Sequence, residues 1–155
     1  MKKELAHIQW VLNIIEGKTE VERVLFRCEE FVIAQDFKWA DIKDVDNMHL
    51  TIIFSDPQLH SLRDLRGHHV PSLEKVEQCL KEVLEEKVGI STNRCRVFFH
   101  YPPTFYRLHI HVMSLSLESL NCRVERCHDF FLVIQNLKLK GDYYKDITLN
   151  NFVEK

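Results

Sequence analysis

The residues of this sequence whose types and spacing could do chemistry are two histidines separated by one position, His109 and His111. They lie in the segment Leu108–Val112, where polar and apolar residues alternate as they do on a strand with one buried face. Both imidazoles should therefore project from one face while the apolar residues enter the core. His100 ends the preceding apolar stretch, and a short antiparallel return would bring it close to the pair.

Three imidazoles in one place are compatible with more than one kind of chemistry. Neutral imidazoles are common zinc ligands, and His-x-His is a common ligand spacing. The same groups could instead hold a phosphate. An exposed strand face also alternates polar and apolar residues routinely, without any function. The spacing alone leaves these three interpretations open.

The composition restricts the classes of function. The chain has 155 residues, 45% hydrophobic and 28% charged, which fits one globular domain over residues 1–155. A net charge of −2 argues against a broad grip on long nucleic acid, although a few local cations could hold a small anion. Five cysteines without a Cys-x-x-Cys pair argue against a disulfide framework or a cysteine-based zinc site. The first residues show no secretory signal, so we expect a cytoplasmic location and leave a nuclear pool open.

The elements in the first third of the chain can be outlined from periodicity. In Leu5–Ile15 apolar residues recur at three- and four-residue intervals and Gly17 follows, which predicts a short helix. Between Glu20 and Trp39, β-favouring residues broken by the charged corner Arg27–Glu30 predict a hairpin. A third strand is predicted at His49–Phe54.

Two further helices and a closing strand are predicted downstream. Ser72 is expected to cap a helix whose apolar stripe runs to Leu84, with Gly89 at its end. A last helix is expected around Arg123–Leu137, and a closing strand at Asp146–Val153.

The histidines themselves are expected on two strands, Arg94–His100 and Arg107–Ser116. The segment Tyr101–Thr104 between them contains two prolines, which forbid continuous ladder pairing and predict an irregular loop. Together these elements predict an α+β fold with a mostly antiparallel sheet and flanking helices.

Read together, the residues around the histidines resemble a known family. The segment His100–Val112 has a His-Tyr pair, a proline-containing loop and alternating histidines, and it resembles the signature of scavenger mRNA decapping enzymes of the histidine triad superfamily. The resemblance extends in register to Ser61–Leu65, Asp36–Trp39 and Gln9–Val11, and so covers nearly the whole chain. It implies a histidine triad-like domain.

The resemblance implies an enzyme that cleaves the triphosphate bridge of a methylguanosine cap, in cap dinucleotide or short capped RNA. His109 would attack the phosphorus next to the methylguanosine and form a covalent nucleotidyl-histidine, which water then hydrolyses to methylguanosine monophosphate. His111 and His100 would donate hydrogen bonds to phosphate oxygens and stabilise the transition state. This scheme requires no metal and no cofactor.

The family's cap-binding residues map onto matching positions here. They would stack on the methylated base (Trp10, Phe37), read its edge (Glu20, Asp36) and contact phosphate (Lys38). The predicted substrate-binding residues are Trp10, Glu20, Asp36, Phe37, Lys38, Tyr101, Thr104, Arg107 and Arg126. Without the resemblance, Trp10 would be a core residue of its helix, the charged residues loop or edge charges, and Trp39 and Tyr101 packing residues.

Two positions depart from the family pattern. Arg107 replaces the first triad histidine and cannot accept a hydrogen bond, so the tautomer of His109 would be set differently. Phe105 stands where the family has a tyrosine, which removes one possible phosphate contact. Arg126 matches a family arginine that follows the triad, but it could equally be a solvated helix charge.

The resemblance also carries expectations about assembly and about rival functions. Better-known members have an additional N-terminal domain that closes over the cap, and this sequence begins just before the matching tryptophan, so we expect a more open site. A homodimer formed by joining two sheets is expected. The rival functions are a cap-binding module without turnover, a dinucleoside polyphosphate hydrolase, and a zinc protein that uses the three histidines.

Overall fold

The computed structural model describes residues 2–18 and 23–151. Its strands form one antiparallel sheet in the order β1-β2-β3-β5-β4-β6, which confirms the predicted fold class. The strands are β1 (Val24–Arg27), β2 (Phe31–Gln35), β3 (His49–Phe54), β4 (Cys95–His100), β5 (His109–Ser114) and β6 (Cys127–Asp129). The α-helices are α1 (Lys2–Glu16), α2 (Val70–Val83), α3 (Phe130–Leu139) and α4 (Tyr143–Asp146). Short helical turns are η2 (Val45–Asn47), η3 (Leu62–Asp64), η4 (Gly67–His69), η5 (Leu84–Val88), η6 (Thr92–Arg94) and η7 (Leu120–Cys122).

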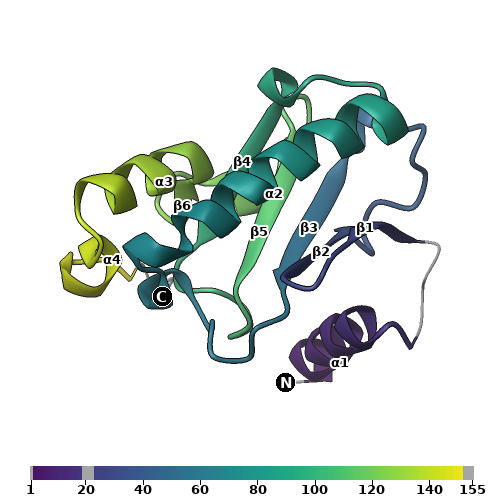
Figure 1. Ribbon diagram of the computed structural model, residues 1–155. Coiled ribbons are helices and arrows are strands. Elements are labelled where there is room, and N and C mark those ends of the chain that lie inside the picture. Colours follow the sequence, from purple (N-terminus) through teal and green to yellow (C-terminus); the bar gives the residue numbers. More distant parts are fainter. Residues whose placement is uncertain (1, 19–22, 152–155) are drawn as a thin grey trace.

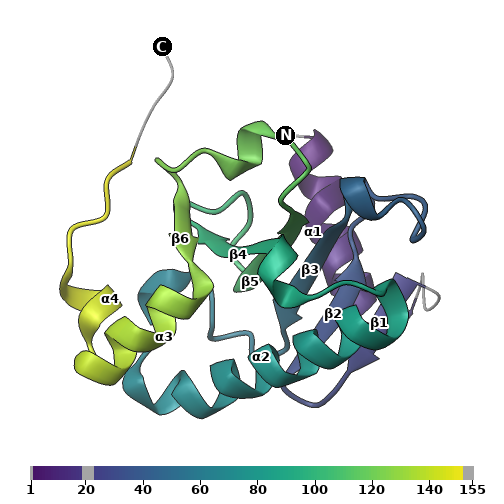
Figure 2. The same cartoon turned by 90° about the horizontal axis from the view of Figure 1, so that it is seen from above.

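The main core lies between the sheet and the helices α2 and α3, which cover one face (Figures 1 and 2). Strand alternation sends Leu50 and Ile52 of β3, and Ile110 and Val112 of β5, to this face, where all four are fully buried. The predicted inward direction of the apolar residues that alternate with the histidines is therefore confirmed.

The opposite face of the sheet carries the histidines and is only partly covered. Helix α1 lies on this side, as the view from above shows (Figure 2). Val11 and Ile14 of α1 pack on Val32 and Ala34 of β2 and on Ile53 of β3. This small second core fixes α1 at the edge of the histidine face. The parts of β3, β5 and β4 that α1 does not cover can therefore form a site.

The structure corrects the predicted start of α2. Ser72 does not cap the helix, because α2 begins at Val70 with Pro71 in its first turn, and His69 occupies the capping position. Proline favours the first helical turn, since the missing N–H would have no partner there. The Ser72 hydroxyl instead donates to Glu30 at 2.6 Å. The helix end was predicted correctly, because Gly89 follows the last turn with a φ of 81°.

The C-terminal predictions also need correction. Helix α3 begins at Phe130 rather than near Arg123, because the carboxylate of Asp129 accepts from the amide of Leu132 and caps the helix there. The predicted strand at Asp146–Val153 is wrong over its described part: Asp146 ends α4, and residues 147–151 form no strand. Residues 152 and 153 lie outside the described residues. Within the described residues, no helix is both long and apolar enough to cross a membrane.

The strand that carries the histidines should depend on its buried face. We expect Ile110→Ala to lower the free energy of unfolding by about 2–5 kcal/mol, because it leaves a cavity under β5. Leu132→Ala, at a 57% exposed position of α3, should change it by less than about 0.5 kcal/mol. Urea denaturation of both variants would measure this. Equal effects would show that β5 is not held by its core face.

Candidate active site

Three neighbouring strands bring four imidazoles together on the open face of the sheet. His109 and His111 project from β5, His100 ends β4, and His49 begins β3. The ring centre of His111 lies 4.4 Å from that of His100, 5.0 Å from that of His109 and 5.5 Å from that of His49. The predicted approach of His100 to the His109–His111 pair is therefore observed, and a fourth histidine joins it.

The tautomer of His109 is set by the backbone. Its Nδ1 lies 2.7 Å from the carbonyl oxygen of Arg107, which can only accept, so Nδ1 carries the hydrogen. In a neutral imidazole the lone pair then resides on Nε2. Phe105 stacks on the ring with centres 4.0 Å apart and planes 15° apart, which holds the ring in place. In a neutral His109, Nε2 is therefore the nitrogen that could accept a proton or attack an electrophile.

His111 lies at the centre of the cluster. Its Nδ1 is 3.2 Å from Nε2 of His49, and its own Nε2 has no hydrogen-bond partner among the described residues. Burial, and then the positive potential of His109, His100, His49 and Lys38, hold the pKa of His111 well below the usual value of 6.5. A neutral His111 can offer an N–H to an anionic ligand without repelling it.

His100 makes its strongest contact with the backbone. Its Nε2 lies 2.6 Å from the carbonyl oxygen of Asn121, so this nitrogen donates. Burial lowers the pKa of His100, although the Asn121 hydrogen bond opposes this. Because Nε2 is occupied in this way, Nδ1 is the nitrogen left to face a ligand.

Two aromatic residues and one lysine lie together at the rim of the site. Trp10 of α1 and Phe37, after β2, pack edge to face with ring centres 5.9 Å apart. The ammonium of Lys38 lies 5.7 Å from the Phe37 ring centre. Phe37 is 42% exposed, so its face is accessible to a ligand. These three predicted residues are therefore brought together.

Asp36 lies deeper than a residue of the rim. The residue is 5% exposed, and its carboxylate accepts from the Thr51 hydroxyl at 2.9 Å and from the Lys38 amide at 3.0 Å. One of its oxygens is also 3.7 Å from Nδ1 of His49. His49 and Thr51 received no role from the sequence. Their alternation on β3 is the same signal that identified the histidines of β5.

These groups surround a small hollow of about 60 Å³. Its lining residues are Trp10, Asp36, Lys38, His49, Thr51, His100, Thr104, Phe105, His109, His111 and Asn121. Pockets that enclose a whole ligand usually measure about 300–1,000 Å³. The hollow therefore suits one phosphate group, and the rest of a nucleotide would extend past the rim.

Three other predicted residues contact the protein outside this hollow. The Arg107 guanidinium donates to the Ser55 carbonyl at 3.1 Å, at the end of β3. Arg126 precedes β6, not in a helix, and donates to the Pro102 carbonyl at 3.1 Å. Tyr101 packs against the guanidinium of Arg63, whose central carbon lies 5.3 Å from the centre of the Tyr101 ring. Glu20 lies outside the described residues.

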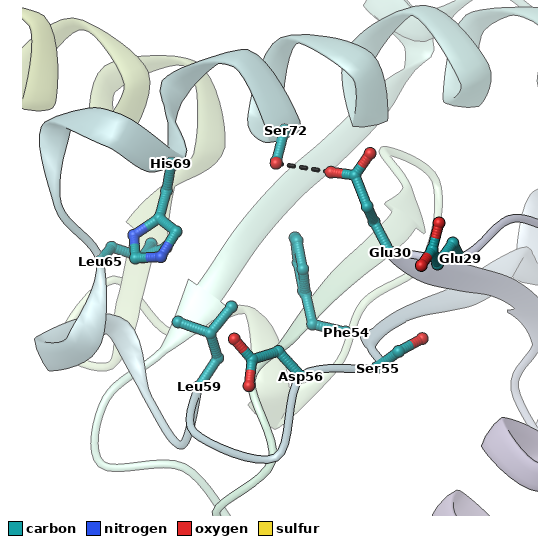
Figure 3. Close-up of a pocket in the computed structure, with 9 residues that line it drawn as sticks. All are labelled: Glu29, Glu30, Phe54, Ser55, Asp56, Leu59, Leu65, His69 and Ser72. Atoms are coloured by element: carbon teal, nitrogen blue, oxygen red, sulfur yellow. Dashed lines mark hydrogen bonds between the residues drawn. The ribbon is translucent and has the colours of Figure 1, made fainter.

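A larger cavity of about 390 Å³ opens on the α2 side of the sheet (Figure 3). Figure 3 shows the hydrogen bond between Ser72 and Glu30 on one side of the cavity. His69 lies on the other side, and Phe54 lies between the two sides. None of the catalytic or substrate-binding residues predicted from the sequence lines it. Its size alone does not make it the reactive site, because the clustered histidines lie on the opposite face of the sheet.

The rival prediction of a zinc site can be compared with the geometry. Within residues 2–18 and 23–151, no three histidine, cysteine or acidic side chains are arranged so that they could hold a metal ion together. His100 and His109 each direct one ring nitrogen to a backbone carbonyl instead.

Comparison with known proteins finds one matching family model and a set of curated relatives. Residues 9–127 match the family model described as scavenger mRNA decapping enzyme C-terminal binding. The m7GpppX diphosphatase of Sus scrofa is 33% identical over 153 residues, which are 96% of this chain and 45% of the relative. That of Homo sapiens is 32% identical over the same shares. The chain thus spans about half the length of the curated relatives it matches.

Solved structures confirm the predicted histidine triad-like fold. A HIT family hydrolase from Clostridium thermocellum is similar with a TM-score of 0.54 and 16% identity, over 72% of this chain and 92% of the other. Hnt3 in complex with DNA and guanosine is similar with a TM-score of 0.56 and 17% identity, over 86% and 79%. At these identities the likeness concerns the fold alone.

The lowered pKa values of the buried histidines predict how stability depends on pH. Below about 6.5, unfolded chains bind protons at His111 and His100 that the folded protein does not bind, so the free energy of unfolding should fall as the pH decreases. Each such group contributes at most about 1.4 kcal/mol per pH unit, until the pH reaches its folded pKa. His111→Gln should flatten the profile measured by urea denaturation between pH 5 and 7.5 (about the range in which histidine titrates). Parallel profiles would show that His111 is not held neutral.

Proposed function

The chain belongs to the scavenger mRNA decapping enzyme family, and we propose that it hydrolyses the triphosphate bridge of methylguanosine caps through His109. The substrate would be cap dinucleotide or short capped RNA, and the products methylguanosine monophosphate and a diphosphate end. The relatives are m7GpppX diphosphatases, which supports this substrate class. A net charge of −2 agrees with a short ligand rather than long RNA.

The observation that carries the proposal is the hydrogen bond from Nδ1 of His109 to the Arg107 carbonyl. It leaves the lone pair on Nε2, in the hollow that His111 also lines. A neutral imidazole is a good nucleophile near pH 7, and a covalent intermediate divides one difficult displacement into two easier steps. The same ring would be a poor nucleophile if a donor faced Nδ1.

In the first step, Nε2 of His109 attacks the phosphorus bonded to the methylguanosine. A P–N bond forms, the bond from that phosphorus to the bridging oxygen breaks, and the diphosphate end leaves with the electron pair. The ring then carries positive charge, which the Arg107 carbonyl stabilises through the Nδ1–H bond. The Nε2–H of neighbouring His111 stabilises the charge on the phosphate oxygens.

In the second step, water attacks the same phosphorus and the P–N bond breaks. The oxygen of the water stays on the methylguanosine monophosphate, the electron pair returns to Nε2, and a proton is released to solvent. His109 is thereby regenerated. Every step uses groups of this chain and water.

The rim supplies groups that suit a methylated guanine. The base carries delocalised positive charge and favours aromatic faces, which Trp10 and Phe37 offer. Lys38 lies over the Phe37 ring and lines the hollow together with the histidines, so its ammonium could contact a bridging phosphate. Asp36, and Glu20 beyond the described residues, are the acids proposed to read the base edge.

The placement of Arg107 favours one second candidate. Its guanidinium donates to the Ser55 carbonyl, so it brings no charge to the hollow. A chain that kept the rim but lacked one triad side chain could bind caps without turning them over. A dinucleoside polyphosphate hydrolase would instead cleave methylated and unmethylated ligands alike.

A homodimer formed by joining two sheets stays a prediction from the family resemblance, as does a cytoplasmic location. Sedimentation of the purified chain would test the first of these. A monomer at all concentrations would contradict the dimer.

The proposed reaction is tested by incubating the purified chain with methylated cap dinucleotide in chelator and separating the nucleotides by chromatography. We expect methylguanosine monophosphate from the wild type, and His109→Ala should lower the rate at least about a thousandfold, because it removes the nucleophile. His68→Ala, outside the hollow, is the control and should match the wild type. Cap binding without product from the wild type would favour the binding module, and equal rates on unmethylated dinucleotide would favour the polyphosphate hydrolase.

The stacking role of Trp10 can be tested separately from turnover. In the His109→Ala background, adding Trp10→Ala should weaken binding of the methylated cap by about 1–3 kcal/mol and that of the unmethylated dinucleotide by less. Calorimetry would measure the binding of both ligands to both variants. In His109→Ala alone, ligand binding should also quench the fluorescence of half-buried Trp10, with Trp39, only 2% exposed, as the internal control. The same loss for both ligands would contradict stacking on the methylated base.

A further inference from the structure

His49 lies beside His111 and lines the same hollow, in a chain of three buried polar groups. It begins β3, where its side chain is 5% exposed and shares a face with His111 of the paired strand. Its Nε2 is 3.2 Å from Nδ1 of His111, and its Nδ1 is 3.7 Å from a carboxylate oxygen of Asp36. The order of the groups is therefore carboxylate, imidazole, imidazole, and all three residues line the hollow.

Two neutral rings in this chain would leave His111 badly prepared for a phosphate. The Asp36 carboxylate favours a hydrogen on Nδ1 of His49. If His49 has only that hydrogen, its Nε2 accepts from Nδ1 of His111, and the lone pair of His111 faces the hollow. A lone pair there would repel the oxygens of an anionic phosphate.

One extra proton shared by the two rings removes this conflict. His49 then has hydrogen on both nitrogens, its Nε2 donates to Nδ1 of His111, and Nε2 of His111 carries a hydrogen that points into the hollow. The Asp36 carboxylate balances the added charge. It is fixed for this purpose, since the Thr51 hydroxyl and the Lys38 amide both donate to it.

We propose that Asp36 and His49 form a positioning pair that holds one proton behind His111, so that Nε2 of His111 always donates to the reacting phosphate. When negative charge develops on that phosphate, the shared proton moves from Nε2 of His49 to Nδ1 of His111. No proton is gained or lost, and the positive charge moves one ring closer to the phosphate. His49 is a positioning residue here, because it acts through His111.

The surroundings agree with this assignment. Burial and the nearby His109, His100 and Lys38 oppose a charge on His111 in the free protein, so the proton rests on His49, next to the carboxylate. The Nε2 atom of His111 has no partner among the described residues and lines the hollow. His109, His100, Lys38 and Asp36 face the shared proton, and together they set the pH at which it is lost.

The inference rests on the proposed cap hydrolysis for its kinetic consequences but not for its structural ones. In the free protein labelled with ¹⁵N-histidine, we expect NMR to show hydrogen on Nε2 of His111 and on both nitrogens of His49. This measurement needs no substrate and no turnover. A wild type with the hydrogen of His111 on Nδ1 would overturn the proposal even if the chain cleaves caps.

The kinetic test uses ring-sized and hydrogen-bonding replacements. His49→Phe should lower kcat about 10- to 100-fold with little change in KM, as is typical when the partner that orients a reactive histidine is removed. His49→Gln keeps an N–H that can donate to His111, so it should restore the His111 tautomer and part of kcat. It also keeps the test valid if the phenylalanine variant does not fold.

A matched surface pair provides the control. His60 has Nδ1 3.4 Å from a carboxylate oxygen of Asp64, but its side chain is 52% exposed and lies outside the hollow. His60→Phe should leave kcat and the His111 tautomer unchanged. Wild-type kcat in His49→Phe, with an unchanged His111 tautomer, would overturn the proposal.

Asp36→Asn separates charge balance from base reading. Without the carboxylate the shared proton should be lost more easily, so the alkaline limb of the kcat profile should move to lower pH. Loss of a base-reading contact alone would raise KM for the methylated cap and leave that limb in place. An unmoved limb would therefore contradict the positioning role of Asp36.

Discussion

The antiparallel pairing of β3 with β5 is the constraint on which the rest of the site depends. It sets Thr51 opposite His111 and Ile53 opposite His109, while Ile52 pairs with Ile110 and faces the core. A shift of one residue would turn every histidine of β5 into the core, where α2 packs. The apolar residues between the histidines therefore fix both the fold and the direction of the reactive groups.

A cluster of buried imidazoles creates an electrostatic problem that the backbone and one carboxylate solve. Burial lowers the pKa of both His100 and His111, so positive charge cannot accumulate among them. Carbonyl groups of Arg107 and Asn121 each orient one ring without adding charge. Asp36 is the buried carboxylate beside the cluster, and it lies next to His49 rather than next to the nucleophile. Charge is thus disfavoured on His100 and His111, while Asp36 can balance a cation at His49 on the neighbouring strand.

The sequence predicted the sheet because alternation and turn signals are local, and it predicted His100, His109 and His111 for the same reason. It did not predict those helix ends that depend on tertiary contacts. Ser72 satisfies a capping rule, yet its hydroxyl donates to Glu30 on the hairpin β1–β2, a partner that only the folded chain provides. His49 was missed because its partners, Asp36 and His111, are 13 and 62 positions away. Only the register of three strands shows that these residues meet.

Arg107, two positions before the proposed nucleophile His109, shows why a motif and a site are different things. A family pattern compares side chains, and by that measure Arg107 is a loss. In the folded chain the group of Arg107 that faces His109 is its carbonyl oxygen, which every residue possesses, while the guanidinium binds the end of β3. The tautomer of the nucleophile therefore survives the substitution. What the substitution removes is a third imidazole on this face of β5, and the imidazole of His49 enters the same cluster from β3. The proposed chemistry needs an oriented Nε2 on His109 and a donor on His111, and both would depend on strand register rather than on the identity of residue 107.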